Sequence, residues 1–141
     1  MVYLVNNKNA LFDEKEARLI FRRNERYLNS PFSYHELKHS DWFFAVVSDK
    51  GETIGVCYVL CENLNGKEVP FYSGAFKRKH HKEVIKAHKI LLNIIFESYE
   101  RAYTFTPHLH ARIFNKKAGM KQDPDNDGVF YLDKKDFYKD I

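Results

Sequence analysis

The fold is decided by three consecutive segments: EVPFYSGAF (Glu68–Phe76), KRKHHK (Lys77–Lys82) and EVIKAHKILLNIIFESYE (Glu83–Glu100). The first is rich in aromatic and β-branched residues and is predicted to be a strand. The third has apolar residues three or four positions apart, which predicts a helix. A second strand, AYTFT, is predicted at Ala102–Thr106. Strands joined through a packed helix lie parallel, so we expect a ligand crevice where the first strand ends and the helix begins.

The start of the predicted helix favours anions. Backbone N–H groups point out of the first turn of a helix, and they attract phosphate above all. The basic residues Arg78, Lys79 and Lys82 stand next to this turn and add positive charge. His88 falls within the apolar stripe of the helix and is expected to be a core residue.

A later segment, HLHARIFNKKAGM (His108–Met120), is predicted to be another helix. Together these segments resemble the GNAT-type N-acetyltransferases over roughly residues 42–133. In that family a strand runs into a pyrophosphate-binding loop, Arg/Gln-x-x-Gly-x-Gly/Ala, which opens a long helix. A later helix follows the pattern Asn-x-x-Ala-x-x-Leu/Phe-Tyr-x-Lys-x-Gly-Phe. The residues that fit this second pattern are Ala111, Phe114, Lys117, Gly119 and Met120.

The chain departs from both family motifs. Arg78 fits the leading position of the first motif, but the two glycine positions fall on His81 and Glu83. In the second motif His108 replaces the usual Asn. Asn115 replaces the Tyr that in this family protonates the coenzyme A thiolate. These departures affect the two signatures closest to acetyl transfer.

The resemblance implies one α+β domain over residues 1–141. Its sheet is expected to be mixed and mostly antiparallel, with a central parallel βαβ crossover. The implied activity is transfer of an acetyl group from acetyl-CoA to an amine of a small molecule or a protein. The residues implied to bind the cofactor are Ala75, Phe76, Arg78, Lys79, His80, His81, Lys82 and Asn115.

Three interpretations of the basic segment Lys77–Lys82 stay open: a pyrophosphate site, a solvated loop and a nucleic-acid patch. Glycine is used in phosphate loops because a bare backbone can approach the phosphates closely. The side chains of His81 and Glu83 stand in the way here, although Arg78 and Lys82 could bind phosphate directly. The net charge of +4 permits an anionic partner but does not require nucleic acid.

The candidate catalytic residues are Glu62, Glu68, Tyr72, His108 and Asn115. A general base must take a proton from the amine, and the first three lie on the two adjoining strands. His108 could serve as an acid or base near neutral pH, or it could cap the following helix. A neutral amide has no usable pKa. If the chain transfers acetyl groups, another group or water must therefore replace the missing tyrosine.

A second class of function is a GNAT-shaped structural or interaction module that has lost catalysis. Some small tailed-phage proteins of the head or virion are similar to GNAT domains in this degraded way. That function implies a protein partner and a place in the virion, whereas an enzyme is expected in the cytoplasm. No apolar run approaches the roughly 20 residues of a membrane helix, and the N-terminus lacks a signal-peptide pattern. We therefore expect no membrane.

The cysteine pair does not predict a disulfide, and the acidic run near residue 125 does not predict a metal site. Cys57 and Cys61 are four residues apart in a predicted strand, about 13 Å, which is too far for a disulfide, so both are expected to be reduced core thiols. The run from Asp123 to Gly128 matches the first half of a calcium loop. Position 134 is Lys instead of Glu, so a plain hairpin turn is predicted there.

The rest of the chain supplies the other elements. A helix is predicted at about residues 13–28, with Asn29-Ser-Pro31 ending it. Ser33 or Ser40 is expected to cap a short turn near residues 34–38. The remaining predicted strands are Val2–Val5, Trp42–Val47, Thr53–Glu62, Lys121–Asp123 and Val129–Leu132, with hairpin turns at Asp49–Glu52 and Asn63–Gly66.

Overall fold

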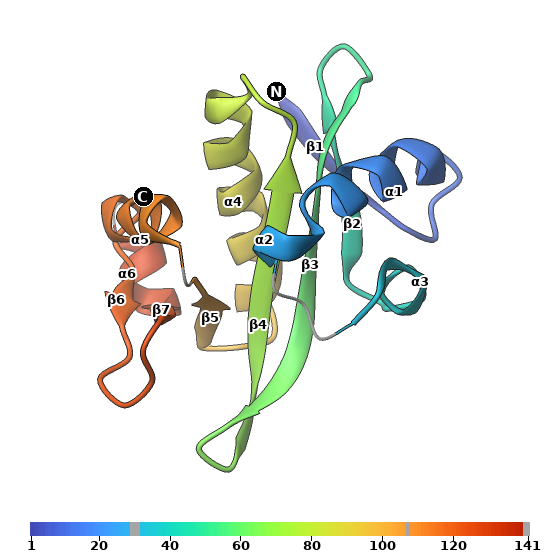
Figure 1. Cartoon of the computed structure of the whole chain (residues 1–141). Coiled ribbons are helices and arrows are strands. Elements are labelled where there is room, and N and C mark those ends of the chain that lie inside the picture. The colour runs from blue at the N-terminus through green and yellow to red at the C-terminus, as the bar shows by residue number, and fades with distance from the viewer. Residues whose placement is uncertain (29–31, 107, 140–141) are drawn as a thin grey trace. The chain divides into compact units, whose positions relative to one another are not determined.

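The computed structural model describes residues 1–28, 32–106 and 108–139 (Figure 1). Within these residues the strands pair in the order β1-β2-β3-β4-β5-β7-β6 and form one seven-stranded sheet. The β4–β5 pair is parallel. The β1–β2, β2–β3, β5–β7 and β6–β7 pairs are all antiparallel. The predicted fold class is therefore confirmed.

The chain divides into two compact units. Unit 1 comprises Met1–Val59 and Ser73–Leu91, and unit 2 comprises Leu60–Tyr72 and Leu92–Ile141. The prediction of a single domain over residues 1–141 stays a prediction.

The first four strands lie side by side in chain order, and the hairpin turns predicted at Asp49–Glu52 and Asn63–Gly66 connect the second strand to the third and the third to the fourth. The four strands are β1 (Val2–Asn6), β2 (Phe43–Ser48), β3 (Thr53–Leu64) and β4 (Lys67–Phe76). Asn65 and Gly66 connect β3 to β4 with φ angles of 54° and 85°. A two-residue hairpin turn of type I′ needs positive φ at both central positions, and Asn-Gly is the pair that adopts it most readily. This local chemistry fixes the register of the long β3–β4 hairpin.

The helix predicted at 13–28 is wrong as a single element, because it breaks at Asn24. Asp13 caps α1 (Glu14–Arg23), with its side chain accepting from the Glu16 amide at 3.2 Å. The Asn24 side chain then donates to the Ile20 carbonyl oxygen at 2.8 Å, and α2 (Glu25–Leu28) follows. Side-chain bonds of this kind compete with the helix ladder. The predicted stop at Asn29–Pro31 lies outside the described residues. The apolar stripe is buried as predicted: Ala17, Ile20, Phe21 and Leu28.

Four aromatic rings form the centre of unit 1. The Phe43 ring centroid lies 5.6 Å from that of Tyr34 and 6.1 Å from that of Tyr58. Phe21 contacts Tyr34 at 5.6 Å and Tyr58 at 6.4 Å. Tyr34 begins α3 (Tyr34–Leu37), where Ser33 makes a full capping box with Glu36. The cap thus positions one ring of the cluster, and the prediction for Ser33 is confirmed.

The parallel crossover is confirmed, with shifted helix ends. α4 spans His81–Phe96, so it begins two residues before and ends four residues before the predicted Glu83–Glu100. After Phe96 the amides bond back to Ile94 and Ile95 in a loose last turn. The next strand, β5 (Arg101–Phe105), pairs in parallel with β4 at Phe71 and Tyr103.

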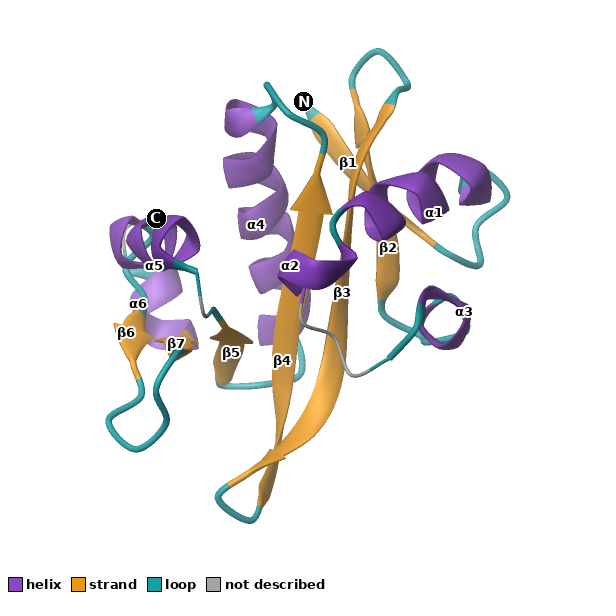
Figure 2. Cartoon of the chain, viewed as in Figure 1, coloured by secondary structure: helices purple, strands orange, loops and turns teal. Residues whose placement is uncertain are grey.

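The last part of unit 2 contains one helix that the sequence did not predict. α5 (Leu109–Lys117) leads to the hairpin of β6 (Lys121–Gln122) and β7 (Val129–Asp133). α6 (Lys134–Tyr138) then packs beside β7 (Figure 2). The Phe137 ring lies 5.3 Å from that of Phe96, and the Tyr138 hydroxyl donates to Asn93. The run between β6 and β7 is a hairpin turn between strands, as predicted.

The two cysteines are both free but differ in exposure. Cys57 is buried, whereas Cys61 is exposed, so the prediction of two core thiols is wrong for Cys61. The reason is that β3 is buried on both faces only as far as Val59. Among the described residues, no helix is long and apolar enough to cross a membrane. No group of three or more His, Cys, Asp or Glu side chains there could hold a metal ion.

Candidate functional site

The candidate residues fall into two groups, one in each unit. The first is the basic turn, Lys77–Lys82, which connects β4 to α4 in unit 1. The Lys77 amide donates to the Ile54 carbonyl oxygen at 2.8 Å and so continues the β3–β4 pairing. Its ammonium group lies 3.3 Å from Glu16 and 3.4 Å from Glu52. The charge of Lys77 is therefore already compensated by two carboxylates.

The other cations of the basic turn are exposed. Arg78, Lys79 and Lys82 have no recorded ion pair among residues 1–28, 32–106 and 108–139. Lys79 has φ of 72°, in the left-handed region. For a residue with a Cβ this conformation costs about 1–2 kcal/mol. A left-handed residue after right-handed ones also turns successive backbone N–H groups toward one concave side, an arrangement that suits anions.

The first turn of α4 adds backbone donors to the basic turn. The Val84 amide makes the first bond of the helix, to the His80 carbonyl oxygen at 2.9 Å. The amides of His81, Lys82 and Glu83 precede it and have no partner within the helix ladder. Cationic side chains and backbone amides at the start of a helix are the groups that bind phosphate in proteins. Because the turn has no glycine, a phosphate would be held here mainly by the side chains.

Ala75 and Phe76 contribute packing at the end of β4. Ala75 is buried, and the ring of Phe76 lies over Gly55 of β3. A Cβ at Gly55 would overlap that ring and come within 2.9 Å of the Ala75 carbonyl oxygen. The two side chains thus hold the hairpin together just before the basic turn.

The second group surrounds the junction of β5 and α5 in unit 2. Asn115 is 5% exposed, and its amide donates to the Thr106 hydroxyl oxygen at 2.9 Å. The Thr106 carbonyl oxygen accepts from Nε of Arg112 at 3.0 Å. Asn115 and Arg112 therefore connect one side of α5 to the end of β5. This arrangement assigns the Asn115 amide a structural hydrogen bond.

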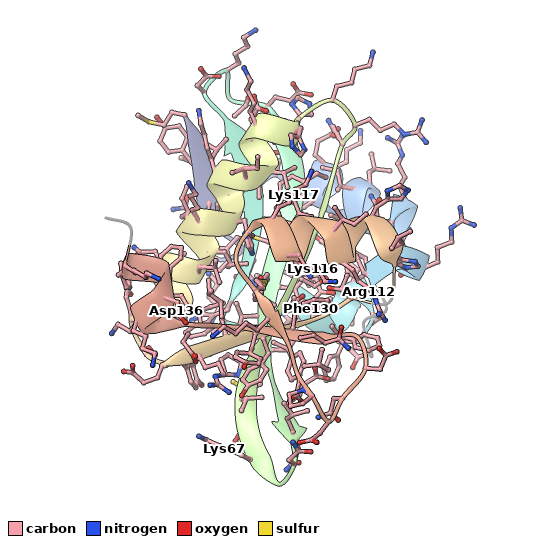
Figure 3. All side chains as sticks on the ribbon, turned by 90° about the vertical axis from the view of Figure 1, so that its left-hand side faces the viewer. Lys67, Arg112, Lys116, Lys117, Phe130 and Asp136 are labelled. Carbon is pink, nitrogen blue, oxygen red and sulfur yellow. The ribbon has the colours of Figure 1, made fainter. Side chains whose placement is uncertain are left out.

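Arg112 is a site residue that sequence reasoning missed. Figure 3 labels Arg112 on α5. Besides Thr106, its guanidinium contacts the Asp127 carboxylate at 3.4 and 3.5 Å. It therefore links α5, β5 and the β6–β7 turn. The acidic residues of the turn between β6 and β7 were the available signal that a basic residue of α5 has a partner there. The spacing in the sequence does not identify which residue it is.

Tyr72 is buried and its hydroxyl donates to Sδ of Met120 at 3.0 Å. Its carbonyl oxygen accepts from the Thr104 hydroxyl at 2.8 Å. Burial raises the pKa of the Tyr72 hydroxyl well above its usual value. Tyr72 thus stays protonated at neutral pH, which makes it unsuited to act as a base.

The remaining candidates also lie in unit 2. Glu62 is half-buried on β3, and Glu68 is exposed at the second position of β4. His108 is exposed and stands at the N-cap position of α5, but its side chain makes no capping hydrogen bond. The prediction that the His108 side chain caps this helix is therefore wrong. The structure brings Asn115 to Thr106 and Tyr72 to Met120.

No model of a protein family and no curated protein matches the sequence. Solved structures do match it over nearly its whole length. An acetyltransferase from Agrobacterium tumefaciens str. C58 has a TM-score of 0.64 and 13% identity, covering 94% of this chain and 91% of that one. An acetyltransferase of the GNAT family from Staphylococcus aureus MU50 has a TM-score of 0.55 and 12% identity, covering 94% and 99%.

The chain has the GNAT fold. A third match with this fold is AtaTR bound with AcCoA, with a TM-score of 0.60 and 12% identity, covering 97% of this chain and 94% of that one. The assignment of the pyrophosphate loop to the basic turn, and of the usual tyrosine position to Asn115 on α5, stays a prediction from the sequence.

Proposed function

We propose that this chain is a GNAT-type acetyltransferase that moves an acetyl group from acetyl-CoA to an amine of a small molecule or a protein. The observation that carries the proposal is the basic turn. It presents Arg78, Lys79 and Lys82 without recorded ion pairs beside the first turn of α4. The match to a GNAT-fold structure bound with AcCoA supports the same cofactor here.

Within this proposal the cofactor supplies a thioester, which is an activated acetyl group. Arg78 and Lys82 hold its pyrophosphate through charge-assisted hydrogen bonds, and the amides of His81, Lys82 and Glu83 add backbone donors. Lys77 takes no part because Glu16 and Glu52 already engage it. Contact through side chains replaces the close backbone contact that glycines permit.

The proposed site has few groups that could transfer a proton. Asn115 cannot exchange a proton, and burial keeps Tyr72 protonated. Glu62, Glu68 and His108 are the candidates that can accept a proton from an amine, with water as the other acceptor. We therefore propose a slow enzyme whose cations bind the cofactor and whose acid catalysis is weak. The cytoplasmic location expected from the sequence belongs to this proposal.

The second candidate function is a GNAT-shaped interaction module, such as a phage virion component, with a protein partner. The observation that favours it is Asn115, whose amide is buried and bonded to Thr106 where the family has its acid. His81 and Glu83 at the glycine positions favour it as well.

Calorimetric titration with acetyl-CoA tests the proposal. We expect the unmodified protein to bind, and Arg78→Ala with Lys82→Ala to weaken binding at least about tenfold, since each charge-assisted contact contributes about 1.5–3 kcal/mol. The matched control removes two exposed cations of α4 outside the turn, Lys86→Ala with Lys89→Ala. It should bind nearly as the unmodified protein does.

Absence of binding heat in the unmodified protein, or an equal loss in the control, would contradict the cofactor site. Duplex DNA provides the other comparison. Salt-dependent DNA binding that disappears with the Arg78 and Lys82 substitutions would instead favour the nucleic-acid interpretation of the basic turn.

A further inference from the structure

The side of α5 that faces away from β5 carries an unusual mixture of residues. Leu109 is 69% exposed and Ile113 is 44% exposed. Three exposed basic side chains accompany them. We call these five residues the outer face of α5: Leu109, His110, Ile113, Lys116 and Lys117.

Helix geometry places the five residues together. Successive residues of an α-helix advance by about 100°. Leu109, Ile113 and Lys117 therefore follow one another at intervals of about one turn along the same side of the helix. Lys116 flanks the apolar pair on one side, and His110 flanks it on the other. Figure 3 shows Arg112, Lys116 and Lys117 along α5. Ile113 is thus the centre of a small apolar patch with cations around it.

The outer face has no acidic counterpart nearby in sequence. Residues 101–122 contain no Asp or Glu. Neither Lys116 nor Lys117 has a recorded ion pair within the described part of the chain. Arg112, by contrast, is paired with Asp127. The positive charge of the outer face is therefore free to attract an anionic partner.

Folding does not require the outer face to be apolar. Two other residues of α5 supply the bonds that hold the helix: Asn115 and Arg112 both donate to Thr106. Exposed Leu and Ile side chains contribute little to the stability of an isolated domain, because they remain in contact with water. They contribute much more when a partner covers them.

We propose that the outer face of α5 binds an acidic amphipathic segment of another protein. Apolar side chains of that segment cover Leu109 and Ile113, and its Asp or Glu side chains pair with Lys116 and Lys117. Anchors one turn apart are the way in which amphipathic helices engage a partner surface. Opposite charges around them guide the encounter and fix its orientation.

Two other anionic partners fit the outer face less well. A nucleic acid would use the lysines but would leave Leu109 and Ile113 uncovered at the centre of the contact. A membrane would cover both, but even a myristoyl chain, with more apolar surface than the two side chains together, gives only marginal membrane binding. An acidic amphipathic segment uses both the apolar and the cationic residues.

Selection from a display library of short, random helical peptides against the full chain tests the proposal. We expect the enriched peptides to combine Asp or Glu with apolar residues one turn apart. Lys116→Glu with Lys117→Glu should weaken their binding at least about tenfold, and so should Leu109→Ser with Ile113→Ser. Circular dichroism and the unfolding midpoint check that both variants remain folded.

Matched controls change the same residue types elsewhere. Lys86→Glu with Lys89→Glu reverses two exposed cations on α4, and Leu11→Ser replaces a side chain that is 81% exposed. Both controls should bind the selected peptides as the unmodified protein does.

Three results would overturn the proposal. The first is a selection that enriches no peptides, or peptides without acidic residues. The second is binding that the outer-face variants leave unchanged. The third is tight binding of single-stranded DNA, or of vesicles of phosphatidylserine and phosphatidylcholine, that Lys116→Glu with Lys117→Glu abolishes while the acidic peptides do not bind. That third result would assign the face to nucleic acid or lipid.

Discussion

At the scale of single residues, Asn115 gives the clearest structural account of a departure from the GNAT motifs. Its side-chain amide is buried and donates to Thr106 at 2.9 Å. Loss of a hydrogen-bond partner in such a place costs about 1–3 kcal/mol. The resemblance predicts that Asn115 stands where the family has its tyrosine. The hydrogen bond from Asn115 to Thr106 could not be predicted from the sequence, because Asn115 lies on α5 and Thr106 follows β5, and their distance depends on where β5 ends. Arg112 was missed for the same reason.

Lys79 carries a prediction about backbone strain. Its φ of 72° disfavours any residue with a Cβ, by about 1–2 kcal/mol, whereas glycine gives up about 0.5–1 kcal/mol of chain entropy. Lys79→Gly should therefore be more stable than Lys79→Ala, by up to about 1 kcal/mol. Both variants lose the charge, so denaturant unfolding of the pair isolates the backbone effect.

The same two substitutions at Lys86, an exposed position inside α4, provide the control. There Ala should be more stable than Gly by about 1 kcal/mol, which is the usual order in a helix. Finding the usual order at Lys79 as well would show that the turn does not hold a left-handed residue in solution.

At the scale of elements, periodicity predicted the long elements, and local bonds decided their ends. The stripe at Ala17, Ile20 and Phe21 predicted a helix whose break at Asn24 depends on one side-chain bond to a carbonyl oxygen. α6 is five residues long, too short for a period, and its aromatic contacts with α4 come from tertiary packing. The Asn65–Gly66 turn was predictable because its chemistry is entirely local.

α4 carries a prediction about pH through His88. Burial lowers the pKa of His88 to about 4, compared with about 6.5 in an unfolded chain. As the pH falls below about 6.5, the unfolded chain therefore binds a proton before the folded chain does. Stability should be full above pH 6.5 and should decrease toward pH 4, by at most about 3 kcal/mol from this residue.

Denaturant unfolding at several pH values between 7 and 4 measures this loss, with His88→Gln as the comparison. The variant should lose less stability over the range than the unmodified protein. His110→Gln, which removes an exposed histidine of α5, is the matched control for the substitution itself. An identical pH dependence in the unmodified protein and His88→Gln would show that His88 titrates alike in both states.

At the scale of the whole molecule, the order of elements was predictable and the chemistry was not. An antiparallel meander followed by a parallel crossover follows from turn residues and from one long amphipathic helix, and this order is the GNAT order. The catalytic assignments depend instead on which side chains meet in space. The ligand crevice expected where β4 ends and α4 begins stays a prediction.

The proposed activity is slow transfer of acetyl groups from acetyl-CoA to an amine. The most direct test is release of free thiol from acetyl-CoA over a panel of amines. General acid help is typically worth 10²–10⁴-fold, so its loss from a typical turnover of about 10 s⁻¹ predicts about 10⁻³–10⁻¹ s⁻¹. This activity should depend on the amine. At acetyl-CoA concentrations below saturation it should fall at least about tenfold with Arg78→Ala and Lys82→Ala, and it should persist with Lys86→Ala and Lys89→Ala. Bound acetyl-CoA without turnover on any amine would contradict the claim and favour the interaction module.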